Sequence, residues 1–211
     1  MKKPIIVINL KTYQQGEKSV KIAKEIERVD KNIILGVQAS DIYEIAKKTK
    51  LKVYAQHVDP FEPGRNTGYI LPEAVKKDKA IGAFLNHSEH KLTLDVIKKT
   101  IARCKKIKLK TMVFVKDIKQ AKEIEKLHPD YLIYEPPELV AGNISISSAK
   151  PEIIKNLSKK LKKTTPFLVG AGIKTREDIT LSMKLGASGI AVSSAITQAK
   201  IPGKKLKELI A

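Results

Sequence analysis

The sequence predicts an α/β protein built as a closed (β/α)8 barrel, and three observations support this architecture. Eight short apolar segments, rich in β-branched residues, each precede a lysine-rich segment with helical periodicity. The apolar segments are nearly continuous in hydrophobicity, as expected for parallel strands that helices cover on both faces. No linker or change in composition interrupts the alternation, so residues 1–211 are expected to form a single domain.

An open doubly wound sheet is the alternative arrangement of the same elements. Dinucleotide-binding sheets of that type carry a G-x-G-x-x-G turn after the first strand. Here the first apolar run continues into Asn9-Leu10-Lys11 and contains no such turn. Eight strand–helix units in one domain therefore favour closure into a barrel.

The predicted strands share a short length and a high content of Val, Ile, Leu, Phe and Tyr, which is typical of buried strands. They cover residues 4–9, 33–37, 51–56, 81–86, 111–115, 131–134, 167–170 and 189–193.

Between the strands, apolar residues recur with the helical period and lysines occupy the remaining positions. Ser40 and Asp41 are favourable N-cap residues and are expected to begin the second helix. The other predicted helices cover residues 17–29, 72–75, 93–107, 118–127, 151–161, a segment starting near 175, and 204–210.

The net charge of +19 raises the question of nucleic-acid binding. Specific recognition of nucleic acids usually relies on arginine forks or aromatic stacking platforms. Only four of the 41 basic residues are arginine, aromatic residues make up 5% of the chain, and tryptophan is absent. The lysines are also spread over every predicted helix. The charge therefore predicts a solvated lysine-rich surface and no specific nucleic-acid partner.

Cysteine content and hydropathy argue against a disulfide-rich protein, a cysteine-ligated metal protein and a membrane protein. The single cysteine, Cys104, excludes a disulfide framework and a multi-cysteine metal site. The sequence contains no charged-then-apolar leader and no apolar run near the roughly 18 residues of a membrane span. We therefore expect a cytoplasmic protein without a membrane partner.

Polar side chains follow several predicted strands at their C-terminal ends, where barrel enzymes place their active sites. Glu135 ends the sixth strand, and Pro136 and Pro137 fix the backbone before a long irregular loop. A carboxylate on a rigid strand end, next to a loop that can close, suits proton abstraction. His87 and Lys11 follow the fourth and first strands.

Together these side chains predict proton transfer next to a carbonyl group. Glu135 would act as the base, neutral His87 would hydrogen-bond the reacting oxygens, and Lys11 would offset negative charge. The small residues in runs 170–173 and 193–195 leave backbone N–H groups that suit a phosphate. No His-Glu-x-x-His pair occurs, so neither a metal nor another cofactor is expected.

Four motifs occur in a fixed order along the chain: Asn9-Leu10-Lys11, Ala55-Gln56-His57, Asn86-His87-Ser88-Glu89 and the Tyr-Glu-Pro-Pro-Glu-Leu run at 134–139. With these motifs the sequence resembles the triosephosphate isomerases from end to end, in the short form found in archaea. The resemblance implies a TIM barrel and an aldose–ketose isomerase of glycolysis and gluconeogenesis.

The resemblance also implies a role for each matching residue. Glu135 would move a proton between carbons one and two of dihydroxyacetone phosphate, which gives D-glyceraldehyde 3-phosphate. His87, kept neutral by a helix N-terminus, would polarise and protonate the enediol oxygens. Lys11, held by Glu89, would stabilise the enediolate, and Asn9 would position the substrate. The implied substrate-binding residues are Asn9, Leu10, Lys11, Val140, Ala141, Gly172, Ser193 and Ser194.

Two departures from the family pattern concern the phosphate end of the site. The family lid usually ends Ile-Gly-Thr-Gly, whereas this chain has Val140-Ala141-Gly142-Asn143, and Ala adopts left-handed backbone angles poorly. Strand eight usually ends Ala-Ser-Gly in archaeal members, whereas Ser193-Ser194-Ala195 stands here. Backbone N–H groups survive both changes, so phosphate binding is expected to persist and any change to affect lid closure.

Members of the family act as dimers, and archaeal members often as tetramers. The resemblance therefore implies a homodimer or homotetramer, in which loop 57–69 reaches a neighbouring subunit through Thr67 at its tip. Like charge on every subunit is expected to oppose this association at low salt.

Other functions stay open at this point. Another phosphate-binding barrel enzyme would need metal ligands or aspartates at the strand ends, where this chain offers one glutamate and one histidine. A basic RNA-binding protein on a retired barrel would be expected to lack one of Lys11, His87 and Glu135, and all three are present. Ala141 and Asn143 also suggest an isomerase whose altered lid favours breakdown of the intermediate to methylglyoxal.

Overall fold

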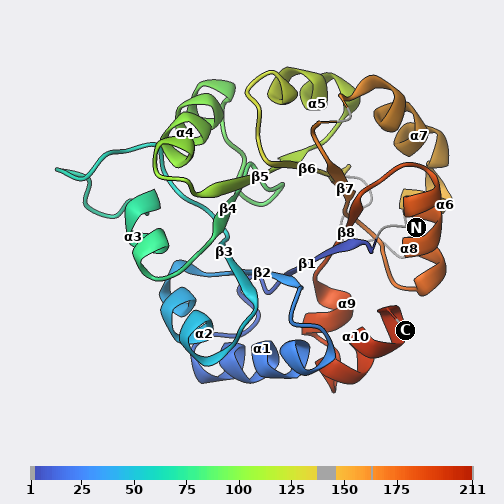
Figure 1. Cartoon of the computed structure of the whole chain (residues 1–211), viewed down its shortest axis with the longest axis horizontal. Helices are drawn as coiled ribbons and strands as arrows, with labels where there is room; N and C mark the ends of the chain where they lie inside the picture. Colours follow the sequence, from blue (N-terminus) through green and yellow to red (C-terminus); the bar gives the residue numbers. More distant parts are fainter. Residues whose placement is uncertain (1–2, 137–145, 163, 211) are drawn as a thin grey trace.

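The computed structural model describes residues 3–136, 146–162 and 164–210. Eight parallel strands pair in sequence order, and β1 pairs with β8, so the predicted closed barrel is confirmed (Figure 1). The strands are β1 (Ile5–Asn9), β2 (Ile34–Val37), β3 (Lys52–Ala55), β4 (Gly82–Leu85), β5 (Lys110–Val115), β6 (Tyr131–Tyr134), β7 (Phe167–Val169) and β8 (Gly189–Val192).

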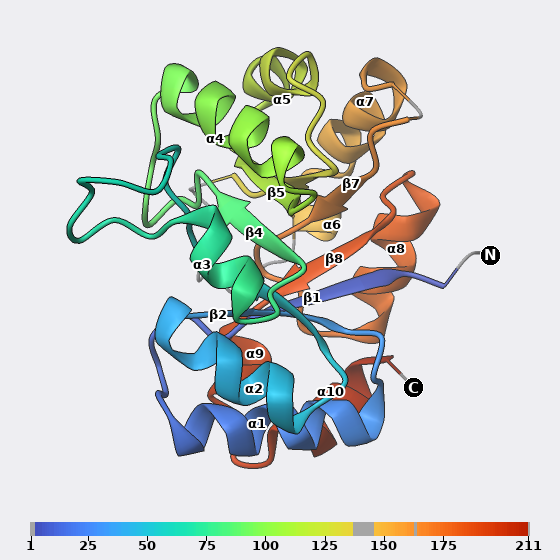
Figure 2. The same ribbon diagram turned by 60° about the vertical axis from the view of Figure 1, so that its left-hand side comes forward.

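Helices surround the barrel and cover the outer face of its strands (Figures 1 and 2). They are α1 (Glu17–Val29), the 3-10 helix η1 (Ala39–Asp41), α2 (Ile42–Lys48), α3 (Pro72–Lys77), α4 (Leu94–Lys106), α5 (Ile118–Glu125), α6 (Ile146–Ala149), α7 (Pro151–Lys160), α8 (Arg176–Lys184), α9 (Ser194–Thr197) and α10 (Pro202–Ile210). In the described part of the chain, none of them has the length and apolar character needed to cross a membrane.

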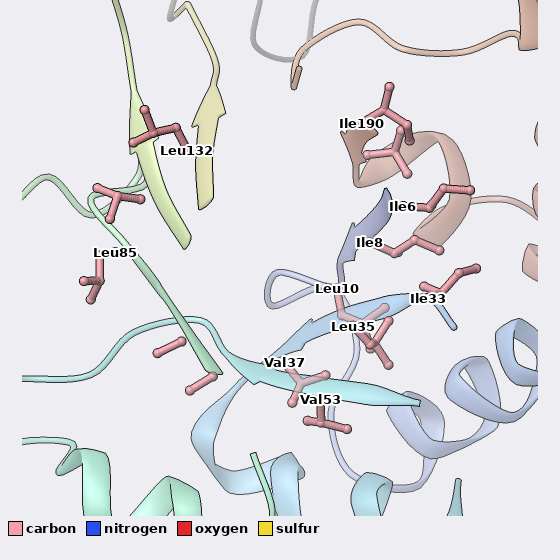
Figure 3. Packing of buried hydrophobic residues seen from close by; sticks show 14 of the residues in the cluster. Ile6, Ile8, Leu10, Ile33, Leu35, Val37, Val53, Leu85, Leu132 and Ile190 are labelled. Carbon is pink, nitrogen blue, oxygen red and sulfur yellow. The ribbon is translucent and has the colours of Figure 1, made fainter. Parts of the chain in front are cut away.

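The barrel buries two hydrophobic layers because successive strand residues face opposite sides of the sheet. The outer layer lies between strands and helices, and Figure 3 shows several of its members, among them Ile6, Ile8, Leu35 and Val53. The inner layer fills the barrel itself with Val7, Ile34, Tyr54, Phe84, Met112, Phe114, Ile133, Leu168 and Ala191.

Two glycines make room for the aromatic rings of the inner layer. A Cβ atom on Gly36 would collide with the Phe84 ring, and one on Gly82 would collide with the Tyr54 ring. Phe84 also meets Phe114 edge to face, with ring centroids 5.6 Å apart. Packed rings therefore fill the interior of the barrel beneath its C-terminal end.

The start of the second helix differs from the prediction that Ser40 and Asp41 cap it. The short helix η1 comes first, and Asp41 has helical backbone angles and makes no capping hydrogen bond with its side chain. A side chain on helical backbone does not reach the first free amides of the next turn. The Asp41 carboxylate instead accepts a hydrogen bond from the Gly16 amide at 3.0 Å, and so fixes the segment before α1.

The segment between β3 and α3 projects from the body of the barrel (Figures 1 and 2). Its base is closed by Asp59, whose amide donates to the Ile70 carbonyl at 2.8 Å and whose carboxylate accepts from the Ile70 amide at 2.7 Å. Further out, Phe61 and Tyr69 meet edge to face at 4.4 Å. These contacts give shape to the loop that the sequence analysis assigns to residues 57–69.

Candidate active site

A cavity lies at the C-terminal ends of the strands, where the sequence places its polar side chains. Its wall includes residues that follow β1, β4, β6, β7 and β8, so distant parts of the chain meet there. Seven predicted site residues line it: Asn9, Lys11, His87, Glu135, Gly172, Ser193 and Ser194.

Lys11 lines the cavity with a cationic side chain, and contacts fix both its side chain and its backbone. Its ammonium group lies 2.6 Å from Oε1 of Glu89, which is the contact expected from the sequence. Its backbone is left-handed, with φ of 50°, and its amide donates to Oδ1 of Asn9 at 2.9 Å. The side-chain amide of Gln56 donates to the same Asn9 oxygen at 3.1 Å and to the Lys11 carbonyl at 2.9 Å. Gln56 therefore orients both Asn9 and Lys11.

His87 is neutral and carries its proton toward the cavity. Its Nδ1 accepts a hydrogen bond from the Glu89 amide at 3.1 Å, so the proton of the neutral ring must be on Nε2. Burial lowers the pKa of His87 to about 4, and Lys11 adds to the lowering while Glu89 opposes it. The Phe114 ring meets His87 edge to face at 4.6 Å and fixes the plane of the imidazole.

The expectation that a helix N-terminus keeps His87 neutral is wrong. Residues 87–90 form a turn, closed by a hydrogen bond from the His90 amide to the His87 carbonyl at 2.8 Å, and α4 begins only at Leu94. The amide that reaches Nδ1 belongs to this turn. Burial of the ring, rather than a helix dipole, is the largest cause of its lowered pKa.

Glu135 is a buried carboxylate next to the histidine. Burial raises its pKa to about 7, although Lys11 and a hydrogen bond from Ser88 act in the opposite direction. Its Oε2 lies 3.4 Å from Nε2 of His87 and accepts from Oγ of Ser88 at 3.3 Å. A Cβ atom on Gly170 would lie 3.1 Å from Oε1, so the glycine after β7 leaves the space that this carboxylate occupies.

The opposite wall of the cavity is built from the ends of β7 and β8. Ala171 and Gly172 both have left-handed backbone, with φ of 77° and 69°. Such a conformation is costly for alanine and is found most often at functional sites. The Ser193 hydroxyl is buried and has no hydrogen-bond partner among the described residues. A buried hydroxyl that lines a cavity without a partner is free to bind a polar ligand there.

The comparisons with known proteins agree with this geometry. A family model described as triosephosphate isomerase matches residues 4–209. The triosephosphate isomerase of Saccharolobus solfataricus is 41% identical over 100% of this chain and 96% of its own. Those of Sulfolobus acidocaldarius and Methanocaldococcus jannaschii are 40% and 38% identical, over 100% and 98% of this chain and 95% and 98% of theirs. The chain belongs to the triosephosphate isomerase family.

Membership of the triosephosphate isomerase family confirms the predicted isomerase, and its archaeal relatives match the predicted short form. These relatives lend no support to a retired barrel that binds RNA or to another kind of phosphate-binding barrel enzyme.

One predicted contact with a triose phosphate, Leu10, is not among the described residues that line the cavity, and two others fall outside the described part of the chain. Leu10 is buried in the outer hydrophobic layer, and its amide donates to the Gly36 carbonyl at 2.9 Å, so neither its side chain nor its N–H faces the site. Val140 and Ala141 lie outside the described residues, as do the lid departures at 140–143.

The structure also brings into the triosephosphate isomerase site residues that sequence reasoning did not single out. Ser88 reaches the carboxylate of Glu135, and Gln56 orients Asn9. Tyr13 and Lys174 line the same cavity. Ser88 and Gln56 lie inside the sequence motifs, but nothing in the sequence indicated which side chains they would contact. Tyr13 and Lys174 carried no signal, because lysine and exposed tyrosine are unremarkable at surface positions.

Proposed function

We propose that this chain interconverts dihydroxyacetone phosphate and D-glyceraldehyde 3-phosphate by proton transfer through an enediolate. The observation that carries the proposal is the pair formed by Glu135 and His87. A carboxylate with a pKa of about 7 faces a neutral imidazole, with 3.4 Å between Oε2 of Glu135 and Nε2 of His87. The N–H of that imidazole points into the same cavity. This pair can remove a proton from carbon while the adjacent oxygen gains one.

The proton moves in two steps. Glu135 takes the proton from carbon one of dihydroxyacetone phosphate, and the electron pair flows onto the carbonyl oxygen at carbon two. His87 gives its Nε2 proton to the oxygen at carbon two and takes the hydroxyl proton from the oxygen at carbon one, so the negative charge of the enediolate moves to the oxygen at carbon one. Lys11 offsets this charge at close range. Glu135 then returns its proton to carbon two, which leaves the aldehyde at carbon one.

The phosphate is proposed to bind at the wall formed by Gly172, Ser193 and Ser194. Consecutive backbone amides at the ends of β7 and β8 suit an anion, as in other barrels of this class. The unpartnered Ser193 hydroxyl supplies one further donor. Asn9 would position the carbon chain between this wall and Glu135. Val140 and Ala141, outside the described residues, are proposed to supply amides to the same phosphate.

We further propose that the chain acts in the cytoplasm, in glycolysis and gluconeogenesis, as a homodimer or homotetramer. Tyr13, Tyr43 and Tyr69 are 40%, 44% and 54% exposed, and they follow three consecutive strands. Tyr43 lies on α2 and the other two lie on loops. Exposed aromatic side chains are typical of contact surfaces between subunits. The projecting loop that contains Tyr69 is the element best placed to reach a second copy (Figure 2).

The decisive experiment compares the wild-type chain with Glu135→Gln in both directions of the triose phosphate reaction. The amide is nearly isosteric but cannot accept the proton, so kcat should fall at least about a thousandfold, equivalent to about 4 kcal/mol of barrier. Glu208→Gln is the matched control, because Glu208 lies on α10 and pairs only at the surface with Lys205. A loss of kcat in Glu135→Gln far smaller than about a thousandfold, or an inactive wild-type chain, would contradict the proposal.

A further inference from the structure

The turn at residues 87–90 contacts every reactive group on its side of the cavity. His87 lies 3.4 Å from Glu135, and Ser88 donates to the same carboxylate at 3.3 Å. Glu89 holds the Lys11 ammonium at 2.6 Å. Small shifts of this turn would therefore move the base, the imidazole and the cation relative to one another.

The fourth residue of the turn, His90, packs on another histidine. Its ring stacks on His57, with centroids 4.2 Å apart and an angle of 23° between the planes. Nearly parallel aromatic rings at this distance attract one another beyond the effect of simple burial. The stack thus joins the turn to the segment that follows β3.

His57 is itself firmly held. Its Nε2 lies 3.1 Å from Oδ1 of Asp59, and the two side chains are only 12% and 17% exposed. The other oxygen of Asp59 accepts from the Ile70 amide at 2.7 Å, where the base of the projecting loop closes. A continuous series of contacts therefore runs from the base of the loop, through Asp59 and His57, to His90 and the turn.

The environment of the His57 ring is compatible with stacking. Burial lowers the pKa of His57, and nearby His90 also lowers it, while the hydrogen bond and charge of Asp59 oppose this. Asp59 and His90 are the titratable groups that face the His57 ring. A neutral His57 ring can donate its Nε2–H to Asp59 and still offer an uncharged face to His90.

We propose that His57 and His90 are positioning residues, whose stacked rings hold the 87–90 turn in the geometry that the isomerase reaction needs. The inference rests on the proposed function and deepens it. The stack fixes the end of the turn, and the turn directs the Glu89 amide to Nδ1 of His87. That hydrogen bond keeps the proton of His87 on Nε2, where it faces the substrate. The Glu89 carboxylate is held toward Lys11 by the same backbone.

Two substitutions of His90 separate stacking from other effects. His90→Ala removes the ring, and kcat should fall about tenfold with KM within about twofold, because misplaced catalytic groups affect the transition state most. His90→Phe keeps a flat ring for the stack and should retain at least about half of the wild-type kcat. Wild-type kcat in His90→Ala, or equal losses in both variants, would overturn the proposal.

The tautomer of His87 is a second readout that a general loss of stability would not move. In ¹⁵N-labelled protein, neutral His87 should have its proton on Nε2 in the wild type and in His90→Phe. In His90→Ala a fraction should move to Nδ1, since the Glu89 amide no longer points at that atom. His87→Gln assigns the signal by removing it. An unchanged tautomer in folded His90→Ala would overturn the proposal.

This readout also separates the inference from the proposed function. The tautomer is measured without substrate, so a chain that proved inactive on triose phosphates would still show whether His90 positions the turn. Conversely, if the enzyme is active and His90→Ala changes neither the His87 tautomer nor kcat, the proposed function stands and the positioning role of His90 is rejected.

Discussion

Glu135 and His87 are driven in opposite directions by the same physical cause. Burial disfavours the charged form of any group, so it raises the pKa of a carboxylic acid and lowers that of an imidazole. Glu135 reaches about 7 and His87 about 4 within one cavity. The carboxylate thereby becomes a stronger base, and the imidazole stays neutral wherever that base is ionised.

The activity should depend on pH accordingly. Only ionised Glu135 can accept a proton, so kcat/KM should be low below the pKa of this group and rise to a plateau above it. With a pKa of about 7, the acid limb is expected to centre near neutral pH, and protonation of His87 at about 4 should add nothing visible. A pH series of kcat/KM with either triose phosphate measures the midpoint. An acid limb centred near 4.5, the ordinary value for glutamate, would contradict the burial argument.

At this scale the sequence predicted side chains that the cavity does bring together, but not the contacts that hold them. Lys11, His87 and Glu135 each come just after a strand, and the barrel geometry brings strand ends together whatever the details of the loops. The neutral state of His87 was assigned to a helix, whereas a turn amide and burial produce it. Ser88 could not be assigned, because a serine in a loop gives no indication of which carboxylate it will reach.

The helices differ in how clearly their ends can be read from sequence. Thr175 precedes α8 with extended backbone and forms a complete capping box with Asp178. Asp41 is an equally favourable residue type, yet its backbone is helical and its carboxylate binds elsewhere. A favourable residue type therefore caps a helix here only where the backbone of that residue is itself extended. The four-residue helices α6 and α9 were not predicted, because a segment that short shows no helical period.

The cap of α8 also supports the wall of the cavity at which we propose that phosphate binds. Asp178 accepts hydrogen bonds from the amides of Lys174 and Thr175 at 2.9 and 3.0 Å, and Lys174 lines the cavity. Thr175→Ala should therefore lower the free energy of unfolding by about 1 kcal/mol and also raise KM for triose phosphates. Urea denaturation and steady-state kinetics measure the two effects.

Thr93→Ala is the matched control for this change. Thr93 caps α4 in the same way, accepting from the Val96 amide at 3.3 Å, but it does not line the cavity. It should lose a similar free energy of unfolding, of about 1 kcal/mol, and leave KM unchanged. Equal effects of both substitutions on KM would show that the α8 cap has no special connection to the site.

For the molecule as a whole, the number of strand–helix units was enough to predict a closed barrel. A barrel of about eight strands has an interior just wide enough for side chains to fill. The inner packing was not readable in this way. Gly36 and Gly82 oppose the rings of Phe84 and Tyr54 from neighbouring or nearby strands. Which glycine faces which ring depends on the register between strands, and the sequence of one strand carries no information on its register with another.

The charge of the whole chain makes a prediction about assembly. Every subunit of a homo-oligomer carries a formal charge of +19, so two copies repel until salt screens them. The screening length falls from about 30 Å at 0.01 M to about 10 Å at 0.1 M ionic strength, so added salt weakens the repulsion between subunits. Self-association should therefore tighten as salt is added.

Sedimentation velocity over a dilution series can test this in potassium chloride at about 10 and 150 mM, concentrations that span that change in screening length. The dissociation constant of the oligomer should be clearly lower at the higher salt concentration, because lysines lie on most of the helices that surround the barrel. Repeating the series with potassium glutamate separates general screening from binding of chloride, since both salts screen equally at equal ionic strength. An oligomer that is insensitive to salt, or that dissociates as salt rises, would mean that ion pairs between subunits outweigh the repulsion of their net charge.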